Sequence, residues 1–493
     1  MGLELDQESF DDADRARFGE RLRRSTKALG LLLERPGFGV GEPTMGAELE
    51  LHLVDDDERP APLNRAVVAQ ARDERITVEA DRFNVEVNAR AVPLRGAPFT
   101  ATAADLDDAL ARLQAAAKPH RARAVMIGIL PTLVANDLTA GALTDGRRYR
   151  ALSDGLRALR HAPFQVHLEG ADELRLTAED VSLEGANTSF QLHLRTSPAE
   201  FAATLNAAQL ATAVTLACAG NSPLFCGKRL WAETRVGLFR QAVDERPTTS
   251  GDDWRPARVS FGHGWVRRGA LELFEESVHQ HAALLPVCSD EEPLAVVEAG
   301  GTPTLAELRL HHGTVWRWNR AVFDPAAGGH LRVELRALPA GPTVVDMMAN
   351  AAMLLGLTLA LRGELESLLT RITFGQARRN FYEAARRGLD AELLWPEPAG
   401  VSPRAWSASA LALHLVPLAR QGLIGAGVRP DEAELHLGTV RARVEAGVTG
   451  ALWQRRVFDE VMRETGDVVV ASRRLVSAYR EQSERGLPVH TWP

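Results

Sequence analysis

The sequence has 493 residues, of which 25% are charged, and it carries a formal net charge of −8 at pH 7. This length is enough for one large catalytic domain with a helical appendage, or for two to three domains. The net charge is negative, and the basic residues are interspersed with acidic ones. Both features argue against a protein that binds DNA or RNA.

Three features of the sequence indicate the cellular compartment: the N-terminus, the apolar runs and the cysteines. The first residues lack a basic region followed by an apolar core, so we expect no secretory signal. The longest apolar run, residues 347–361, is interrupted by Asn350 and predicts a buried helix rather than a membrane span. Cys218, Cys226 and Cys288 lack metal-ligand spacing and fit reduced thiols, none of them a candidate nucleophile. We therefore expect a cytoplasmic protein with no membrane partner.

In chain order, the first expected element is a charged amphipathic helix over residues 8–35, which Pro36 ends. A glycine-rich stretch with Gly37, Gly39 and Gly41 follows. Because no strand precedes these glycines and no Gly-Lys-Ser/Thr follows them, we do not assign a phosphate-binding loop here.

Residues 45–54 predict the β-strand around which we expect the other elements to be organised. Leucines at alternate positions form an apolar face. The opposite face carries Glu48, Glu50 and His52. Two carboxylates on one strand face repel each other, but a solvated edge tolerates this at low cost, so the strand alone does not indicate a site.

The same alternation recurs in three later segments. Their polar faces carry Asn84, Glu86 and Asn88 in residues 83–88, Gln191, His193 and Arg195 in residues 190–195, and Arg332, Glu334 and Arg336 in residues 331–336. If the four strands share a sheet, its apolar face packs on helices and its polar face lines a trough. Clustered glutamates with one histidine suit Mg²⁺ or Mn²⁺, and interleaved arginines suit phosphate. Residues 76–81 lead into the strand with Glu86, so Glu79 could face the same metal as Glu86.

Two segments contain arginines whose role remains open. Residues 231–239 are rich in aromatics and charge, so Arg235 is either held in place or paired at the surface with Glu233 or Asp244. In residues 315–320 two tryptophans share the face opposite Arg317 and Asn319. That segment is either a core strand with a solvated back or an anion-binding wall.

The remaining chain is expected to be mostly helical. Before residue 376 we expect a helix over 103–125, a short apolar strand over 124–130, polar irregular loops over 140–185, and helices over about 198–219 and 343–370. From 376 onward we expect only helices, near 376–388, 405–424, 430–446, 451–465 and 468–484, with a linker marked by Pro396, Pro398 and Pro403.

In their order and spacing, these motifs resemble the glutamate–cysteine ligase family, most closely its bacterial and plant-like carboxylate–amine ligase branch. The motifs are Gly46-Ala47-Glu48-Leu49-Glu50, Glu79 with Glu86, Gln191-Leu192-His193, Ala219-Gly220-Asn221-Ser222-Pro223, and Arg332-Val333-Glu334-Leu335-Arg336. The resemblance implies an α+β fold: a curved antiparallel sheet that forms a glutamine-synthetase-like half-barrel with outer helices, plus a C-terminal helical region. The implied divisions are an N-terminal helix (1–35), a catalytic domain (36–375) and the helical region (376–493).

The resemblance also implies a reaction and roles for residues. Family members join the γ-carboxylate of glutamate to an amine, and ATP is consumed through an acyl phosphate. The implied Mg²⁺ ligands are Glu48, Glu50, Glu79, Glu86, Glu334 and His193. The other implied roles are catalysis by Arg336 with Glu334, nucleotide contacts by Gln191, His193 and Arg332, and binding of the amino acids by Arg235, Arg317, Arg320 and Asn88.

Two departures from the family leave alternatives open. The Gln-x-His order at residues 191–193 differs from members with His or Asn there, and the region after residue 376 has no matched motif. The leading prediction is a ligase for glutamate and cysteine that uses ATP and Mg²⁺ or Mn²⁺. The alternatives are a ligase for another amino acid or small peptide, and a non-catalytic nucleotide-binding regulator. The oligomeric state stays open, with a homodimer as one option.

Overall fold

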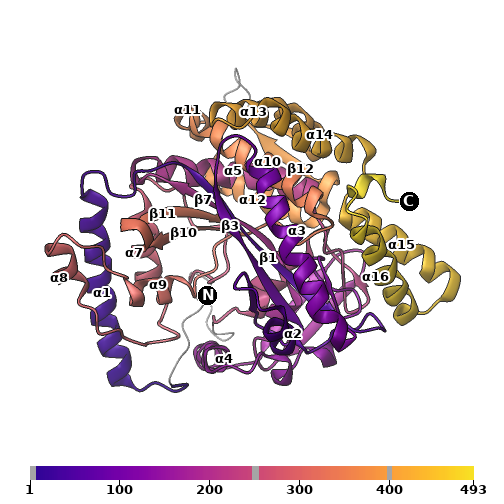
Figure 1. The fold of residues 1–493 in the computed structure, drawn as a ribbon, viewed down its shortest axis with the longest axis horizontal. Helices are drawn as coiled ribbons and strands as arrows, with labels where there is room; N and C mark the ends of the chain where they lie inside the picture. Colours follow the sequence, from indigo (N-terminus) through magenta and orange to yellow (C-terminus); the bar gives the residue numbers. More distant parts are fainter. Residues whose placement is uncertain (1–6, 247–254, 397–401) are drawn as a thin grey trace.

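The structure is a computed structural model that describes residues 7–246, 255–396 and 402–493. At its centre lies an antiparallel sheet with the strand order β10-β11-β7-β1-β3-β2, in which β4 also pairs with β1 (Figure 1). Its strands are β1 (Thr44–Val54), β2 (Ile76–Val78), β3 (Asn84–Pro93), β4 (Arg123–Val125), β7 (Phe190–Thr196), β10 (Asn319–Asp324) and β11 (His330–Leu335). The prediction that the four alternating segments share one sheet is confirmed.

The register of the sheet brings the predicted polar positions together. The opposed pairs are Glu48 with Asn88 and with Gln191, Glu50 with Glu86, and Glu334 with His193. Because side chains alternate between the two faces of a strand, opposed residues lie on the same face of the sheet. The polar side chains of four strands therefore form one continuous surface.

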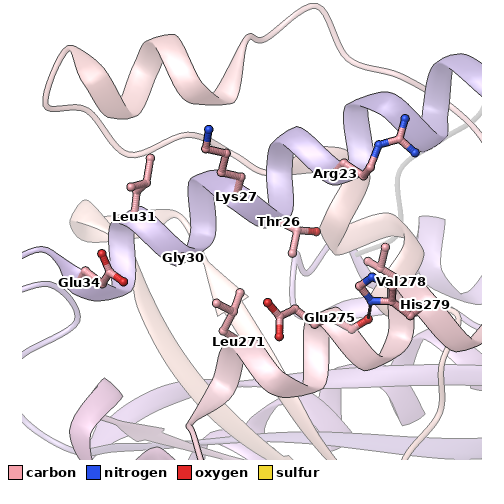
Figure 2. Close-up of a pocket in the computed structure, with 10 residues that line it drawn as sticks. All are labelled: Arg23, Thr26, Lys27, Gly30, Leu31, Glu34, Leu271, Glu275, Val278 and His279. Carbon is pink, nitrogen blue, oxygen red and sulfur yellow. Dashed lines mark hydrogen bonds between the residues drawn. The ribbon is translucent and has the colours of Figure 1, made fainter.

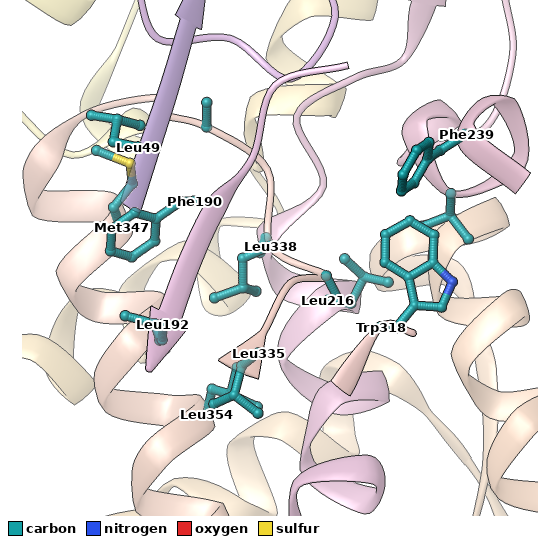
Figure 3. Close-up of a cluster of buried hydrophobic side chains, with 14 of the residues drawn as sticks. Leu49, Phe190, Leu192, Leu216, Phe239, Trp318, Leu335, Leu338, Met347 and Leu354 are labelled. Carbon is teal, nitrogen blue, oxygen red and sulfur yellow. The ribbon is translucent and has the colours of Figure 1, made fainter. Parts of the chain in front are cut away.

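The apolar face of the sheet packs on two long helices, α5 (Phe201–Ala219) and α10 (Val344–Arg362). Figure 3 shows Leu49, Leu192 and Leu335 from the strands gathered near Met347 and Leu354 of α10. These side chains are at most 1% exposed. Burial of such side chains is the main force that holds the helices to the sheet.

The same two helices are long and apolar enough to cross a membrane. In the segments Pro198–Ala219 and Val344–Arg362, 89% and 83% of the apolar 18-residue stretch is buried inside the structure. Such burial is typical of core helices, which need apolar residues all round because they have protein on every side. The predicted buried helix at residues 347–361 is thus confirmed as part of α10.

The N-terminal helix α1 (Asp12–Glu34) is confirmed, with Asp11 as its N-cap. It packs on three helices, α7 (Ala270–Gln280), α8 (Pro293–Glu298) and α9 (Ala306–His312). A groove between α1 and α7 is lined by both basic and acidic side chains, including Lys27 and Glu275 (Figure 2). None of its lining residues belongs to the polar face of the sheet.

The five predicted C-terminal helices are present. They are α12 (Phe374–Arg387), α13 (Ala408–Gly425), α14 (Pro430–Ala446), α15 (Gly450–Thr465) and α16 (Val468–Glu484). The prediction of helix alone is wrong, because β12 (Glu392–Trp395) and β13 (Arg404–Ser407) form a hairpin near the expected proline linker. The Asn380 amide stabilises this hairpin by hydrogen bonds to both backbone groups of Leu394. Pro398 lies outside the described residues.

Several expected boundaries also need correction. Residues 140–185 are not irregular loops, because they contain α4 (Arg147–Arg160) and a hairpin of β5 (Phe164–Glu169) and β6 (Glu173–Ala178). The alternating burial of Phe164, Val166 and Leu168 explains this hairpin. The helix expected over 103–125 is α3 (Pro98–Ala117), and only the first residues of the expected strand after it pair, as β4. The helices expected over 198–219 and 343–370 correspond to α5 and to α10 with α11 (Leu365–Leu369).

Candidate active site

Three side chains from β1, β7 and β11 converge on the polar face, and we call them the histidine cluster: Glu48, His193 and Glu334. Their ligand atoms all lie within 4.8 Å of one another. His193 Nε2 lies 2.9 Å from Glu48 Oε1. Within the described part of the chain, however, neither buried ring nitrogen of His193 has a partner with hydrogen-bond geometry. An imidazole surrounded by carboxylates in this way is suited to coordinate a cation.

The two carboxylates of the histidine cluster stay ionised. Burial opposes ionisation of Glu48, but the neighbouring His193 outweighs it and lowers the pKa of this carboxyl. Burial likewise opposes ionisation of Glu334, but Arg320 and Arg336 hold its pKa well below the ordinary value. Arg320 contacts both oxygens of Glu334, with Nε to Oε2 at 2.8 Å and Nη2 to Oε1 at 3.0 Å.

A second group, Glu50, Glu79 and Glu86, forms the carboxylate cluster beside it, again with ligand atoms within 4.8 Å of one another. Burial, followed by repulsion from Glu48 and Glu50, raises the pKa of Glu86 to about 7. Burial and repulsion from Glu86 raise the pKa of Glu79 well above its ordinary value. Burial also raises the pKa of Glu50. A bound divalent cation would offset this repulsion in place of the protons that the raised pKa values favour.

Arg336 and Gln191 connect the two clusters. Arg336 Nη1 donates to Gln191 Oε1 at 2.6 Å and to Glu334 Oε2 at 3.0 Å. Gln191 Nε2 in turn donates to Glu50 Oε1 at 2.9 Å. The amide of Gln191 thus orients Arg336 between the clusters, and the Arg336 side chain remains 16% exposed.

The other predicted binding residues fall into two groups. Arg320, Arg332 and Asn88 lie on the polar face: Arg332 Nη2 lies 3.3 Å from Asp324 Oδ2, and Asn88 Nδ2 donates to Glu86 Oε1 at 2.6 Å. Arg235 and Arg317 do not lie on the strands of the sheet, because Arg235 belongs to α6 (Thr234–Ala242) and Arg317 precedes β10.

Both of these off-sheet arginines are buried in ion pairs. Arg235 Nε donates to Glu233 Oε1 at 2.7 Å, and Arg235 Nη2 donates to the carbonyl of Ala337 at 2.7 Å. A surface pair was one option for Arg235, but Glu233 is fully buried, so the pair is internal. Arg317 pairs with Glu276. Of the two alternatives for residues 315–320, the core strand with a solvated back is excluded, since Arg317 and Asn319 are both buried.

Three site residues escaped the sequence predictions. Ser189 donates from its backbone and hydroxyl to Glu50 Oε2, at 2.7 Å and 2.9 Å. It shares the parity of Gln191 and His193, so extending the alternation by one step would have found it. Glu184 lies in the turn η4 (Glu184–Ala186), where burial and the charge of Glu50 raise its pKa to about 7. Asp81, whose carboxyl lies against Gly185 next to Glu184, is fully buried, and neither of its carboxyl oxygens has a hydrogen-bond partner among the residues described.

Both clusters fit a divalent cation by their chemistry. Carboxylate oxygens with one imidazole nitrogen are the donors that Mg²⁺ and Mn²⁺ accept. The His193 ring, whose nitrogens make no hydrogen bond among the described residues, and the crowded carboxylates are the observations that support this fit. A polar sheet face with two such clusters and a bridging arginine is suited to bind and orient phosphate groups.

Comparisons with known proteins place this geometry in context. The family model described as glutamate-cysteine ligase family 2 (GCS2) matches residues 44–472. A glutamate–cysteine ligase of Francisella tularensis, solved in complex with AMP, is similar with a TM-score of 0.52 and 12% identity, over 89% of each chain. A bifunctional glutathione synthetase from Pasteurella multocida has a TM-score of 0.50 and 11% identity, over 94% of this chain and 55% of that one. No curated protein matches by sequence. At these identities the two structures indicate a shared fold alone.

Proposed function

The chain belongs to glutamate-cysteine ligase family 2 and is a carboxylate–amine ligase, and on this premise we propose that it joins the γ-carboxylate of glutamate to the amine of cysteine at the expense of ATP. The observation that carries the proposal is the pair of acidic clusters bridged by Arg336 and Gln191. We also propose that the central sheet curves into a half-barrel like that of glutamine synthetase. Nucleotide use is supported by the AMP bound to the Francisella tularensis enzyme.

The proposed reaction has two steps. A carboxylate is a poor electrophile, so one of its oxygens first attacks the γ-phosphorus of ATP, the bond to the bridging oxygen breaks, and ADP leaves. The amine nitrogen then attacks the acyl carbon, inorganic phosphate leaves with the electron pair, and the nitrogen loses a proton. Positioning and charge stabilisation carry most of the catalysis in such transfers.

In this mechanism the chain's own residues orient and stabilise the transferring group. Arg336 is held by Glu334 and Gln191, so that its free N–H groups can donate to the phosphoryl oxygens as charge develops on them. Arg320 has all three nitrogens engaged, by Glu334 and the carbonyl of Gly313. This engagement favours a role for Arg320 in holding Glu334 in place.

Divalent cations would be held by the two clusters. The residues that would hold them are Glu48, His193 and Glu334 in the histidine cluster and Glu50, Glu79 and Glu86 in the carboxylate cluster. When bound, Mg²⁺ would neutralise charge on the phosphates of ATP. We propose in addition that Gln191, His193 and Arg332 contact the nucleotide and that Asn88 contacts the amino acids. The buried ion pairs of Arg235 and Arg317 favour a structural role for both arginines.

The experiment is an assay of ADP release by the purified protein with ATP, Mg²⁺ and glutamate, with and without cysteine. Cysteine-dependent ADP together with the mass of γ-glutamylcysteine is the expected result. ADP that requires another amine or another acid would keep the ligase and replace its substrates. No ADP with any pair of amino acids would contradict the proposal and favour a nucleotide-binding regulator.

A matched pair of variants connects the assay to the site. Glu334→Gln keeps the shape of the side chain and removes its charge, so we expect loss of activity with an unchanged circular dichroism spectrum. Glu298→Gln removes an exposed carboxylate at the end of α8 and should leave activity unchanged. A fully active Glu334→Gln variant would remove Glu334 from the proposed machinery.

A further inference from the structure

Two arginines lie directly opposite each other at the end of the polar face. Arg195 on β7 pairs in register with Arg332 on β11, two residues along both strands from the pair His193 and Glu334. Like charges at opposed positions of an antiparallel pair destabilise the sheet, because their Cβ atoms are only about 5 Å apart. The arrangement is therefore costly unless a negative group lies between the two guanidinium groups.

The described residues supply too little negative charge to balance this pair. Arg332 has one carboxylate, Asp324, at 3.3 Å. Arg195 makes no hydrogen bond or ion pair to any residue within 7–246, 255–396 and 402–493, and the buried Nε atoms of both arginines lack hydrogen-bond partners there. His330 lies on the same face opposite Asp324. Burial lowers the pKa of His330, and the charges of Arg195 and Arg332 lower it further.

The glycine-rich stretch after α1 covers one side of this pair. A side chain at Gly41 would overlap the guanidinium group of Arg195, so the backbone passes directly over it. Earlier in the same stretch, Phe38 stacks on Phe323 of β10, with ring centroids 6.4 Å apart, on the apolar side of the sheet. Arg195 is only partly buried and Arg332 is 29% exposed, so the opposite side stays open to solvent. Gly41 of this glycine-rich stretch thus lies against one side of the arginine pair.

We propose that Arg195 and Arg332 bind an anionic group of a substrate, either a carboxylate of the acid substrate or a phosphate of the nucleotide. Two guanidinium groups present parallel N–H donors that match the oxygens of either group. The pair lies two residues along the strands from His193 and Glu334, which is about 7 Å at the rise of a β-strand. That spacing is comparable to the separation of the two carboxylates of glutamate and to the reach of a triphosphate. The inference rests on the proposed function and extends it by assigning Arg195 and Arg332 to one anionic group of the substrates.

The test measures binding of each candidate group separately. Isothermal titration calorimetry with L-glutamate and with the Mg²⁺ complex of AMPPNP, a non-hydrolysable ATP analogue, is applied to the wild type, Arg195→Ala and Arg195→Lys. We expect Arg195→Ala to weaken the binding of one of the two probes by about 10- to 100-fold, as for a lost charge-assisted contact. Arg195→Lys keeps the charge without the planar fork, so its loss should be smaller. Arg175→Ala removes an exposed arginine on β6 and should bind both probes like the wild type.

The outcomes distinguish a carboxylate from a phosphate as the bound group. They also distinguish failure of the anion site from failure of the ligase proposal. Weaker binding of glutamate assigns the site to a carboxylate, and weaker binding of AMPPNP assigns it to a phosphate. Unchanged binding of both probes by Arg195→Ala would overturn the inference, and so would a wild type that binds neither. ADP release is measured in parallel. If the wild type releases no ADP with any acid, while Arg195→Ala still binds AMPPNP more weakly than the wild type, the ligase proposal fails and the anion site stands.

Discussion

Replacement of Arg336 by alanine should separate catalysis from folding. Arg336 Nη1 makes two contacts on the polar face, to Gln191 and to Glu334, while Glu334 keeps both contacts with Arg320. Glu334 therefore stays compensated in the variant, and we expect it to fold. If Arg336 stabilises charge that develops in phosphoryl transfer, its removal should cost about 2.7–4 kcal/mol of transition-state stabilisation. That cost corresponds to a loss in kcat of about 100- to 1,000-fold.

The assay for this prediction is the steady-state rate of ADP release, with the acid, the amine and ATP each varied in turn. We expect kcat to fall while KM for ATP changes little, because the contact is made mainly in the transition state. Arg175→Ala serves as the matched control, since it removes an exposed arginine on β6, which is not a strand of the central sheet. A kcat within about twofold of the wild type would refute the reasoning, as would a loss explained wholly by KM.

Three further predictions concern stability. Because the pKa values of Glu86 and Glu184 rise from 4.5 to about 7 on folding, the folded state binds more protons between these values. In EDTA the unfolding temperature should therefore fall as pH rises from about 4.5 to 7, and Glu86→Gln should flatten this dependence. Added Mg²⁺ should raise the free energy of unfolding, and with it the unfolding temperature, more at pH 8 than at pH 5, by up to about 2.7 kcal/mol at a hundredfold excess over its Kd. Equal shifts at both pH values would contradict binding to the carboxylates. Arg443→Met should destabilise the fold by about 3–5 kcal/mol in denaturant titrations, since it leaves the buried Asp346 without its 2.7 Å partner, and addition of Asp346→Asn should restore part of that loss.

The local patterns of the sequence determined much of the fold. Period-two alternation identified the strands that carry Glu48, Glu86, His193 and Glu334, because which face a side chain takes depends only on its place in its own strand. Helical periodicity and punctuation by glycine and proline likewise located the C-terminal helices to within a few residues. These features follow from short-range geometry, which a single segment contains in full.

Tertiary structure alone decided the pairing between segments. The register that puts Arg195 opposite Arg332 depends on strands that are far apart in the chain, and alternation within each strand does not encode it. Glu184 reaches the site from a turn without periodicity, and Arg235 is held by Glu233 and a backbone carbonyl inside the core. The physical reason is that non-local packing fixes such positions: each contact forms only when the sheet and its covering helices have already brought distant segments together.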